Sequence, residues 1–160
     1  MAQDFRETSP DDGSCGFQQW VDPLAASMQS SNVQLRSLSP LALAYIGDAV
    51  YELFVRSRLL MPSRQIRVFH REVVDHVRAE QQALYLECLR PHLSETEIDI
   101  LRRARNAASG RKARASLRDY RQATALEALL GYLYLSDPQR LMEVLAYLPI
   151  ASESLPTPSV

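Results

Sequence analysis

The sequence predicts a single all-α domain, and three observations support that class. The chain has 160 residues but only five glycines, which is few for a fold rich in loops. Apolar residues recur at intervals of three and four, and no stretch alternates apolar with polar residues as a half-buried strand would. Capping residues and prolines separate the periodic stretches. A chain of this length supports one core, so we expect four to six helices over residues 37–148.

The first predicted helix follows Ser39 and Pro40, which are an N-cap residue and a proline at the first helical position. It includes residues 41–55 and ends before Pro62. Helical spacing resumes over residues 64–89, where apolar positions share one face and basic residues lie on the other. Pro91 marks the next break.

The later helices also carry start signals. Ser94 and Glu97 form a capping box ahead of an apolar stretch. A basic loop of small residues is expected over 106–116, before a helix that begins near Asp119. Asp137, with proline directly after it, is predicted to cap a short final helix.

Charge is distributed unevenly along the chain, although the formal net charge is only −1. Residues 1–36 are polar and acidic and are expected to form a flexible leader, and residues 149–160 a flexible tail. Residues 56–121 hold a large excess of arginine over acids, and Lys112 is the only lysine. Arginine suits bidentate phosphate contacts, but a genome rich in G and C would produce the same bias. Both explanations stay open.

The expected location is the cytoplasm. The N-terminus is acidic and polar, unlike a signal peptide, and acids interrupt the longest apolar stretches. Cys15 and Cys88 form neither a CxxC pair nor a disulfide framework, which favours an intracellular chain with free thiols.

The strongest functional signal is a pair of acids beside glycines. The stretch LALAYIGDAVYELFV holds Asp48 directly after Gly47, and ATALEALLGYLYL holds Glu127 one turn before Gly131. Glycine inside a helix costs about 1 kcal/mol relative to alanine, so each glycine suggests a close helix crossing. A crossing there would bring the two acids together, each on the buried stripe of its helix. A buried carboxylate must be paired or bound to a metal.

Two carboxylates and a set of waters suit Mg²⁺, with the remaining ligands supplied by a phosphate substrate. Such a metal would activate water and stabilise charge on phosphorus. The alternative is that Asp48 and Glu127 pair with arginines or lie at a helix edge in solvent. Glu52, one turn beyond Asp48, is a weaker candidate that would support the metal ligands from behind.

A basic segment lies just before the helix that carries Glu127. Residues 102–121, RRARNAASGRKARASLRDYR, contain eight bases and one acid. Binding to a nucleic-acid backbone and a merely solvated surface are the two interpretations. Double-stranded RNA is a natural ligand, because it is recognised mainly through its shape, phosphates and 2′-hydroxyls. The candidate RNA-binding residues are Arg103, Arg105, Asn106, Arg111, Lys112 and Arg114.

Three motifs in order give a resemblance to a known family. AYIGDAVYELFVR (44–56), RRARNAASG (102–110) and YRQATALEALLGYLYL (120–135) resemble Mini-ribonuclease III, a ribonuclease III catalytic domain without the double-stranded RNA-binding domain. The resemblance covers about residues 37–148. It implies the all-α ribonuclease III endonuclease-domain fold and a homodimer that cleaves double-stranded RNA with Mg²⁺, or with Mn²⁺ in its place. The implied substrate is the precursor of large-subunit (23S) ribosomal RNA, and a ribosomal protein is a further expected partner.

The resemblance also assigns roles and shows departures. It implies that Asp48 and Glu127 are catalytic residues that bind the metal. Full-length ribonuclease III has further acids, at positions occupied here by Leu41, Ala44 and Thr124, but Mini-ribonuclease III lacks them too. Ala108 stands where the family leads us to expect lysine, which we interpret as a lost phosphate contact, offset by Arg111 or Lys112.

Two other functions stay open at this point. One is a non-catalytic RNA-binding or ribosome-associated protein on a ribonuclease III scaffold. Retention of both Asp48 and Glu127 favours the enzyme over such a protein, because a degenerate scaffold would be free to lose them. The other is a helical protein–protein interaction module whose basic stretch is simply solvated.

Overall fold

The computed structural model describes residues 35, 37–108 and 116–150. Within these residues the chain forms helices and connecting loops and contains no strand, which confirms the predicted all-α class. The elements are α3 (Pro40–Leu59), α4 (Ile66–Val77), α5 (Ala79–Leu89), the short 3₁₀ helix η1 (Arg90–His92), α6 (Glu95–Ala107), α7 (Leu117–Ser136) and α8 (Pro138–Ala146).

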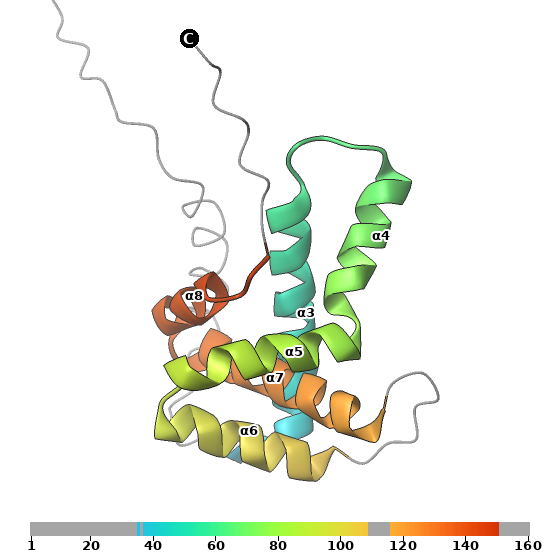
Figure 1. Ribbon diagram of the computed structural model, residues 1–160. Coiled ribbons are helices and arrows are strands. Elements are labelled where there is room, and N and C mark those ends of the chain that lie inside the picture. Colours follow the sequence, from blue (N-terminus) through green and yellow to red (C-terminus); the bar gives the residue numbers. More distant parts are fainter. Residues whose placement is uncertain (1–34, 36, 109–115, 151–160) are drawn as a thin grey trace, which may run out of the picture.

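Helix α7 lies at the centre of the fold, where α3, α5, α6 and α8 pack against it (Figure 1). Its second half is almost wholly buried, as expected for a helix that is apolar on every side. Helix α3 crosses it, α5 and α6 lie along it, and α8 packs near its end. Helix α4 packs mainly against α3, so α3 and α7 together support every other helix.

The predicted helix starts are confirmed by their capping bonds. Ser39 Oγ accepts a hydrogen bond from the backbone of α3, and Ser94 and Glu97 make both bonds of a capping box. The Asp137 side chain caps α8. Ser116 caps α7, which therefore begins at Leu117 rather than near Asp119.

The stretch 64–89 is divided into two helices, a break that spacing did not predict. Arg78 is extended, with φ −65° and ψ 149°, and it ends α4 and begins α5. Side chains from elsewhere stabilise this break: the Tyr51 hydroxyl and the Gln82 amide each donate to a carbonyl at the end of α4. These carbonyls have no partner within their own helix. The apolar spacing is similar on both sides, so it cannot reveal a break that distant residues stabilise.

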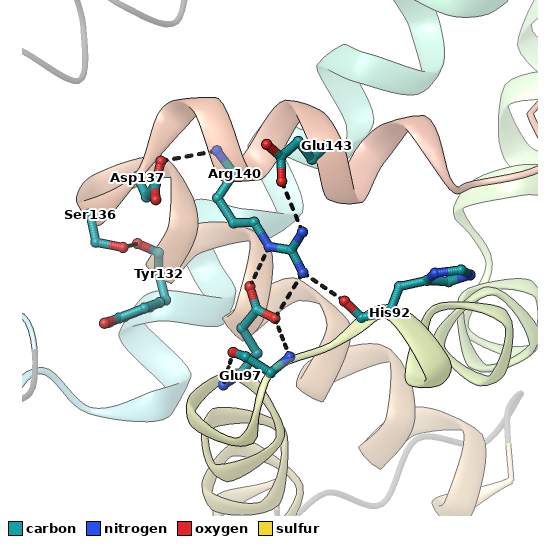
Figure 2. A network of polar contacts seen from close by, with 8 residues as sticks. His92, Glu97, Tyr132, Ser136, Asp137, Arg140 and Glu143 are labelled. Atoms are coloured by element: carbon teal, nitrogen blue, oxygen red, sulfur yellow. Dashed lines mark hydrogen bonds and ion pairs between the residues drawn. The ribbon is translucent and has the colours of Figure 1, made fainter.

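A polar network ties α6 to α8 at the opposite end of α6 from its basic residues (Figure 2). Glu97 is only 4% exposed. Its two carboxylate oxygens accept hydrogen bonds from Arg140 Nε and Nη2 at 2.9 and 3.2 Å, and from the Ser94 backbone at 2.7 Å. Arg140 also donates to Glu143. Burial by itself raises the pKa of Glu97, but the bonds from Arg140 and Ser94 bring that pKa below its ordinary value.

The hydrophobic core extends slightly past the predicted domain bounds of 37–148. Leu35 and Ile150 are both buried in it, 2% exposed each. Across the described part of the chain, none of the helices has the length and apolar character needed to cross a bilayer.

Candidate active site

Helices α3 and α7 cross at Gly47 and Gly131, where their backbones touch. A Cβ atom on Gly47 would lie 1.7 Å from the carbonyl oxygen of Glu127, and one on Gly131 would lie 2.0 Å from that of Leu43. Both distances are far below van der Waals contact, so neither position admits a side chain in this packing. The predicted close crossing is confirmed, and it explains why two helices keep a residue that weakens them.

The crossing places Asp48 and Glu127 on the walls of one open cleft. The cleft has a volume of about 590 Å³ and is bounded by α3, α5, α7 and the α4–α5 junction. Its lining also includes Tyr45, Glu80 and Gln82. Three helices that are distant in sequence therefore contribute polar side chains to one concave surface.

The prediction that both acids lie on a buried stripe is wrong for Asp48, which is exposed, while Glu127 is half-buried. On α3 the core-facing residues include Gly47 and Tyr51. Successive helical residues differ by about 100° in direction. With Gly47 pressed against α7, Asp48 is therefore turned away from the core, to the edge of the cleft. Contact with water removes the desolvation cost of its negative charge.

Glu127 is held by a glutamine that sequence reasoning missed. Gln82 Nε2 donates to Glu127 Oε1 at 3.2 Å and to the carbonyl of Val77 at 2.9 Å. Gln82 lies 45 residues from Glu127 in sequence. A glutamine is ordinary on a helix, so the sequence contains no signal for this contact.

Tyr51 of α3 is a buried neighbour of Glu127. Its side chain is fully buried, and its hydroxyl donates to the carbonyl of His76 at 2.9 Å. Burial raises the pKa of Tyr51 far above its ordinary value, and the neighbouring charges of Tyr85 and Glu127 raise it further. The Tyr51 hydroxyl is therefore a neutral hydrogen-bond donor at neutral pH.

The donor atoms of the cleft fit a hard divalent cation. Mg²⁺ commonly binds one or two protein carboxylates, keeps several waters and takes further oxygens from substrate phosphates. Asp48 and Glu127 present such carboxylates to an open cleft. Over residues 35, 37–108 and 116–150, no group of three or more His, Cys, Asp or Glu side chains is placed to hold a metal ion. This donor set suits a cation that shares its shell with water and substrate, and does not suit zinc enclosed by four protein ligands.

The structure does not bring Glu52 to the cleft. Its carboxylate accepts a hydrogen bond from Arg56 at 2.5 Å, one turn further along α3. An i,i+4 pair of this kind is ordinary on a helix surface. Glu52 is therefore not among the residues that line the cleft.

A second concave surface is rich in arginine. Arg90 after α5, Arg105 and Asn106 on α6, and Arg118 and Arg121 on α7 line a pocket of about 880 Å³. We call these five residues the arginine pocket. Two of them, Arg105 and Asn106, are predicted RNA-binding residues. Sequence reasoning did not single out the other three, because only the packing of α5 and α6 on α7 brings them together.

Of the remaining predicted RNA-binding residues, the structure describes only Arg103. Arg103 lines a different cavity, together with Asp99 and Tyr132. Arg111, Lys112 and Arg114 lie outside the described residues.

Ala108, the position where a lysine was expected, is buried at the end of α6, only 1% exposed. Its carbonyl accepts a hydrogen bond from Arg121 Nε at 3.2 Å. The residue at this position therefore packs inside the fold and helps to hold an arginine of the pocket.

Comparison with known proteins supports a family assignment. The sequence matches the family described as Ribonuclease III domain over residues 41–138. The Mini-ribonuclease 3 of Thermosynechococcus vestitus is 52% identical over 117 residues, which cover 73% of this chain and 78% of the relative. That of a Synechococcus species is 50% identical over 129 residues, covering 81% and 94%. A crystal structure of a protein from Fusobacterium nucleatum matches with a TM-score of 0.63 and 30% identity, covering 69% of this chain and 91% of that one.

Proposed function

The chain belongs to the ribonuclease III domain family, among the Mini-ribonuclease 3 proteins, and from this we propose that the cleft of Asp48 and Glu127 is its catalytic site. Membership makes the chain an endoribonuclease of the ribonuclease III type, a family that acts on double-stranded RNA. The observation that carries the site assignment is the glycine crossing, since it fixes both carboxylates on one open cleft.

The proposed cofactor is Mg²⁺, with Mn²⁺ able to replace it. When bound, the cation supplies Lewis-acid chemistry that activates water and neutralises charge on the scissile phosphate. Asp48 and Glu127 would hold it, because their carboxylates face the cleft from opposite helices. Gln82 orients Glu127, and Tyr51 supports the junction behind it with a neutral hydroxyl. The exposed position of Asp48 leaves room for a phosphate to approach.

The arginine pocket is the proposed contact for the RNA backbone. Helix α7 joins it to the catalytic cleft, because Arg118 and Arg121 line the pocket while Tyr120 and Glu127 line the cleft. A duplex lying over the first turns of α7 would therefore reach both surfaces. Arginine–phosphate contacts would supply affinity without sequence selectivity. The predicted contacts of Arg111, Lys112 and Arg114 belong to the same proposal.

The proposed substrate is the precursor of 23S ribosomal RNA, cut within a paired end, in the cytoplasm and with a ribosomal protein as helper. This assignment is supported by the relatives named Mini-ribonuclease 3. The test is cleavage of the precursor transcript and of a plain duplex of equal length. Selective cleavage near one paired end of the precursor is expected, and equal random cleavage of both RNAs would contradict the substrate assignment.

A homodimer is proposed because cutting both strands of a duplex requires two sites. Apolar side chains remain exposed along α3 and beyond its end, at Leu41, Tyr45, Leu53, Met61 and Ile66, and Tyr45 is 82% exposed. Large exposed apolar surfaces commonly mark protein interfaces.

Light scattering tests the dimer. Wild type is expected at twice the monomer mass, and Tyr45→Glu at the monomer mass, because a buried unpaired charge is costly at an interface. Ile98→Glu on α6, where Ile98 is also exposed, is the matched control and should stay dimeric. A monomeric wild type at working concentration would contradict this part of the proposal.

The catalytic assignment is tested with a long RNA duplex and purified wild type, Asp48→Asn, Glu127→Gln and Glu143→Gln. Wild type should cleave with Mg²⁺ or Mn²⁺ and not with a chelator. The first two variants should lose about 10³-fold or more in rate while binding RNA normally, because each removes a metal ligand. Glu143 pairs with Arg140 on α8, so its variant should remain active.

Two outcomes would contradict parts of this assignment. Undiminished cleavage by Asp48→Asn or Glu127→Gln would show that the site is misplaced. Salt-sensitive RNA binding without cleavage of either the duplex or the ribosomal precursor would favour the non-catalytic RNA-binding protein.

A further inference from the structure

The junction between α4 and α5 is only one residue long, and side chains from two other helical positions complete its hydrogen bonding. Arg78 is the single extended residue between the helices. The last carbonyls of a helix lack intrahelical partners. Here the Tyr51 hydroxyl donates to the carbonyl of His76, and Gln82 Nε2 donates to that of Val77, both at 2.9 Å. The junction is therefore fixed from α3 and from α5 at once.

Gln82 gives its second amide hydrogen to Glu127 Oε1, at 3.2 Å. Both neighbours of this amide nitrogen are oxygen acceptors. A flipped side chain would set its own oxygen against them, so the orientation of the amide is determined. Gln82 is 2% exposed and has little freedom to move. One rigid side chain therefore connects the Glu127 carboxylate to the end of α4.

A second buried glutamine on the same interface gives a natural comparison. Gln122 of α7 is 7% exposed and donates Nε2 to Glu87 Oε1 of α5, at 3.0 Å. The α5–α7 interface thus has two Gln–Glu contacts, one in each direction. They differ in what they hold: Glu87 is exposed and also accepts from Arg90 at 2.9 Å, whereas Glu127 lines the catalytic cleft.

We propose that Gln82 is a positioning residue for the metal site: it holds the Glu127 carboxylate in the direction in which a divalent cation is bound. This inference rests on the function proposed above. An amide is a neutral donor, so it orients the carboxylate without cancelling the negative charge that a cation requires. A side chain that hydrogen-bonds to a metal ligand fixes the orientation of that ligand. Removing such a side chain therefore weakens metal binding.

Packing alone gives a poor reason for a glutamine here. Gln82 Oε1 is buried and, within the described residues, has no hydrogen-bond donor, and the same is true of Gln122 Oε1. A buried acceptor without a partner reduces stability. Methionine has a similar length and no such acceptor. A purely structural role therefore predicts that Gln82→Met and Gln122→Met behave alike, whereas a positioning role predicts that they differ.

The experiment measures Mn²⁺ binding to the full-length protein without RNA, by electron paramagnetic resonance of the free ion. Gln82→Met should weaken Mn²⁺ binding by about 10- to 100-fold, the range found when such supporting residues are removed. Gln122→Met should change it by less than about twofold, since Glu87 is no part of the cleft. Thermal melting of both variants should agree within a few degrees. Gln82→Asn, which keeps the amide but loses its reach, is a second variant and should lose the same affinity.

The Glu127→Gln variant distinguishes a failure of the role proposed for Gln82 from a failure of the proposed metal site. If it loses Mn²⁺ binding while Gln82→Met and Gln82→Asn bind as well as wild type, the role of Gln82 is overturned and the proposed catalytic site stands. If Glu127→Gln itself binds Mn²⁺ normally, the metal site is misplaced and both proposals fail. A loss of affinity in Gln122→Met equal to that in Gln82→Met would also overturn the positioning role.

Discussion

Glu97 and Glu127 lie at two ends of the same core and are held in different ways. Glu97 is the more deeply buried, and its oxygens accept bonds from the Arg140 guanidinium and from the Ser94 backbone (Figure 2). Glu127 is half-buried, takes a bond from the neutral amide of Gln82, and faces an open cleft. Both belong to helices that pack on the same interior.

The difference shows that the more deeply buried acid is the one enclosed by bonding partners, while the acid at the open cleft is the less buried one. A carboxylate enclosed by a cation and backbone donors has its charge compensated, so it serves to join α6 to α8. The amide that orients Glu127 is neutral and carries no compensating charge. The helix crossing beside Glu127 supplies the rigidity that Arg140 supplies beside Glu97.

The largest effect on stability should come from disrupting the glycine crossing between α3 and α7, beside Glu127. Gly131→Ala would place a Cβ atom 2.0 Å from the carbonyl oxygen of Leu43, so the helices must separate. We expect a loss of more than about 4 kcal/mol in the free energy of unfolding, measured by urea denaturation. Alanine normally stabilises a helix relative to glycine by about 1 kcal/mol. A stabilised Gly131→Ala would therefore contradict the crossing.

The next effect comes from removing the cation beside Glu97. Arg140→Met leaves a buried carboxylate without its charge partner and should cost about 3 kcal/mol, because an uncompensated buried charge is unfavourable. Cleavage per folded molecule should stay unchanged at a temperature where the variant is folded. A variant that kept full stability but lost cleavage would reverse the roles that we assign to the two ends.

A pH titration sharpens the contrast further. In the folded protein the pKa of Glu97 lies below its ordinary value, while an unfolded glutamate has a pKa of about 4.3. The carboxylate therefore contributes stability that is fully present above about pH 4.3 and is lost as pH falls through the lower folded pKa. The difference in unfolding free energy between wild type and Glu97→Gln should be constant near neutral pH, at about 2 kcal/mol, and shrink in acid. A difference that grew in acid would refute the linkage.

The smallest effect is expected at the capping box. Ser94→Ala removes the side-chain acceptor of the Glu97 backbone N–H and should cost about 1 kcal/mol, measured by thermal or urea unfolding. Ser39→Ala at the start of α3 is a matched cap outside the Glu97 network. If the Glu97–Arg140 network strengthens the capping bond, Ser94→Ala should lower the free energy of unfolding by more than Ser39→Ala. Equal costs would show that the cap and the Arg140 bonds act independently.

Local chemistry explains which features the sequence predicted. The N-cap bonds of Ser39, Ser94 and Asp137 join residues within one helical turn, so the local sequence is enough to predict them. The crossing was also predictable, because a glycine inside an apolar helix needs a steric reason. Features that depend on contacts between residues distant in sequence could not be predicted in this way.

The break at Arg78 depends on donors from Tyr51 and Gln82, and spacing shows neither. The exposure of Asp48 follows from which side of α3 meets α7, a direction that the pattern of apolar residues left ambiguous. The arginine pocket forms only where the end of α5, α6 and α7 meet, and the sequence does not show how these helices pack.

The contact between Gly47 and Gly131 also has a consequence for protein engineering. Main-chain atoms set the spacing of the two acids, so side-chain substitutions on the rim should alter what the cleft accepts without changing that spacing. A library that keeps both glycines and randomises Glu80 and Tyr120 would vary the rim outside the proposed dimer surface. Selection from such a library is a route to altered substrate preference with the catalytic framework intact.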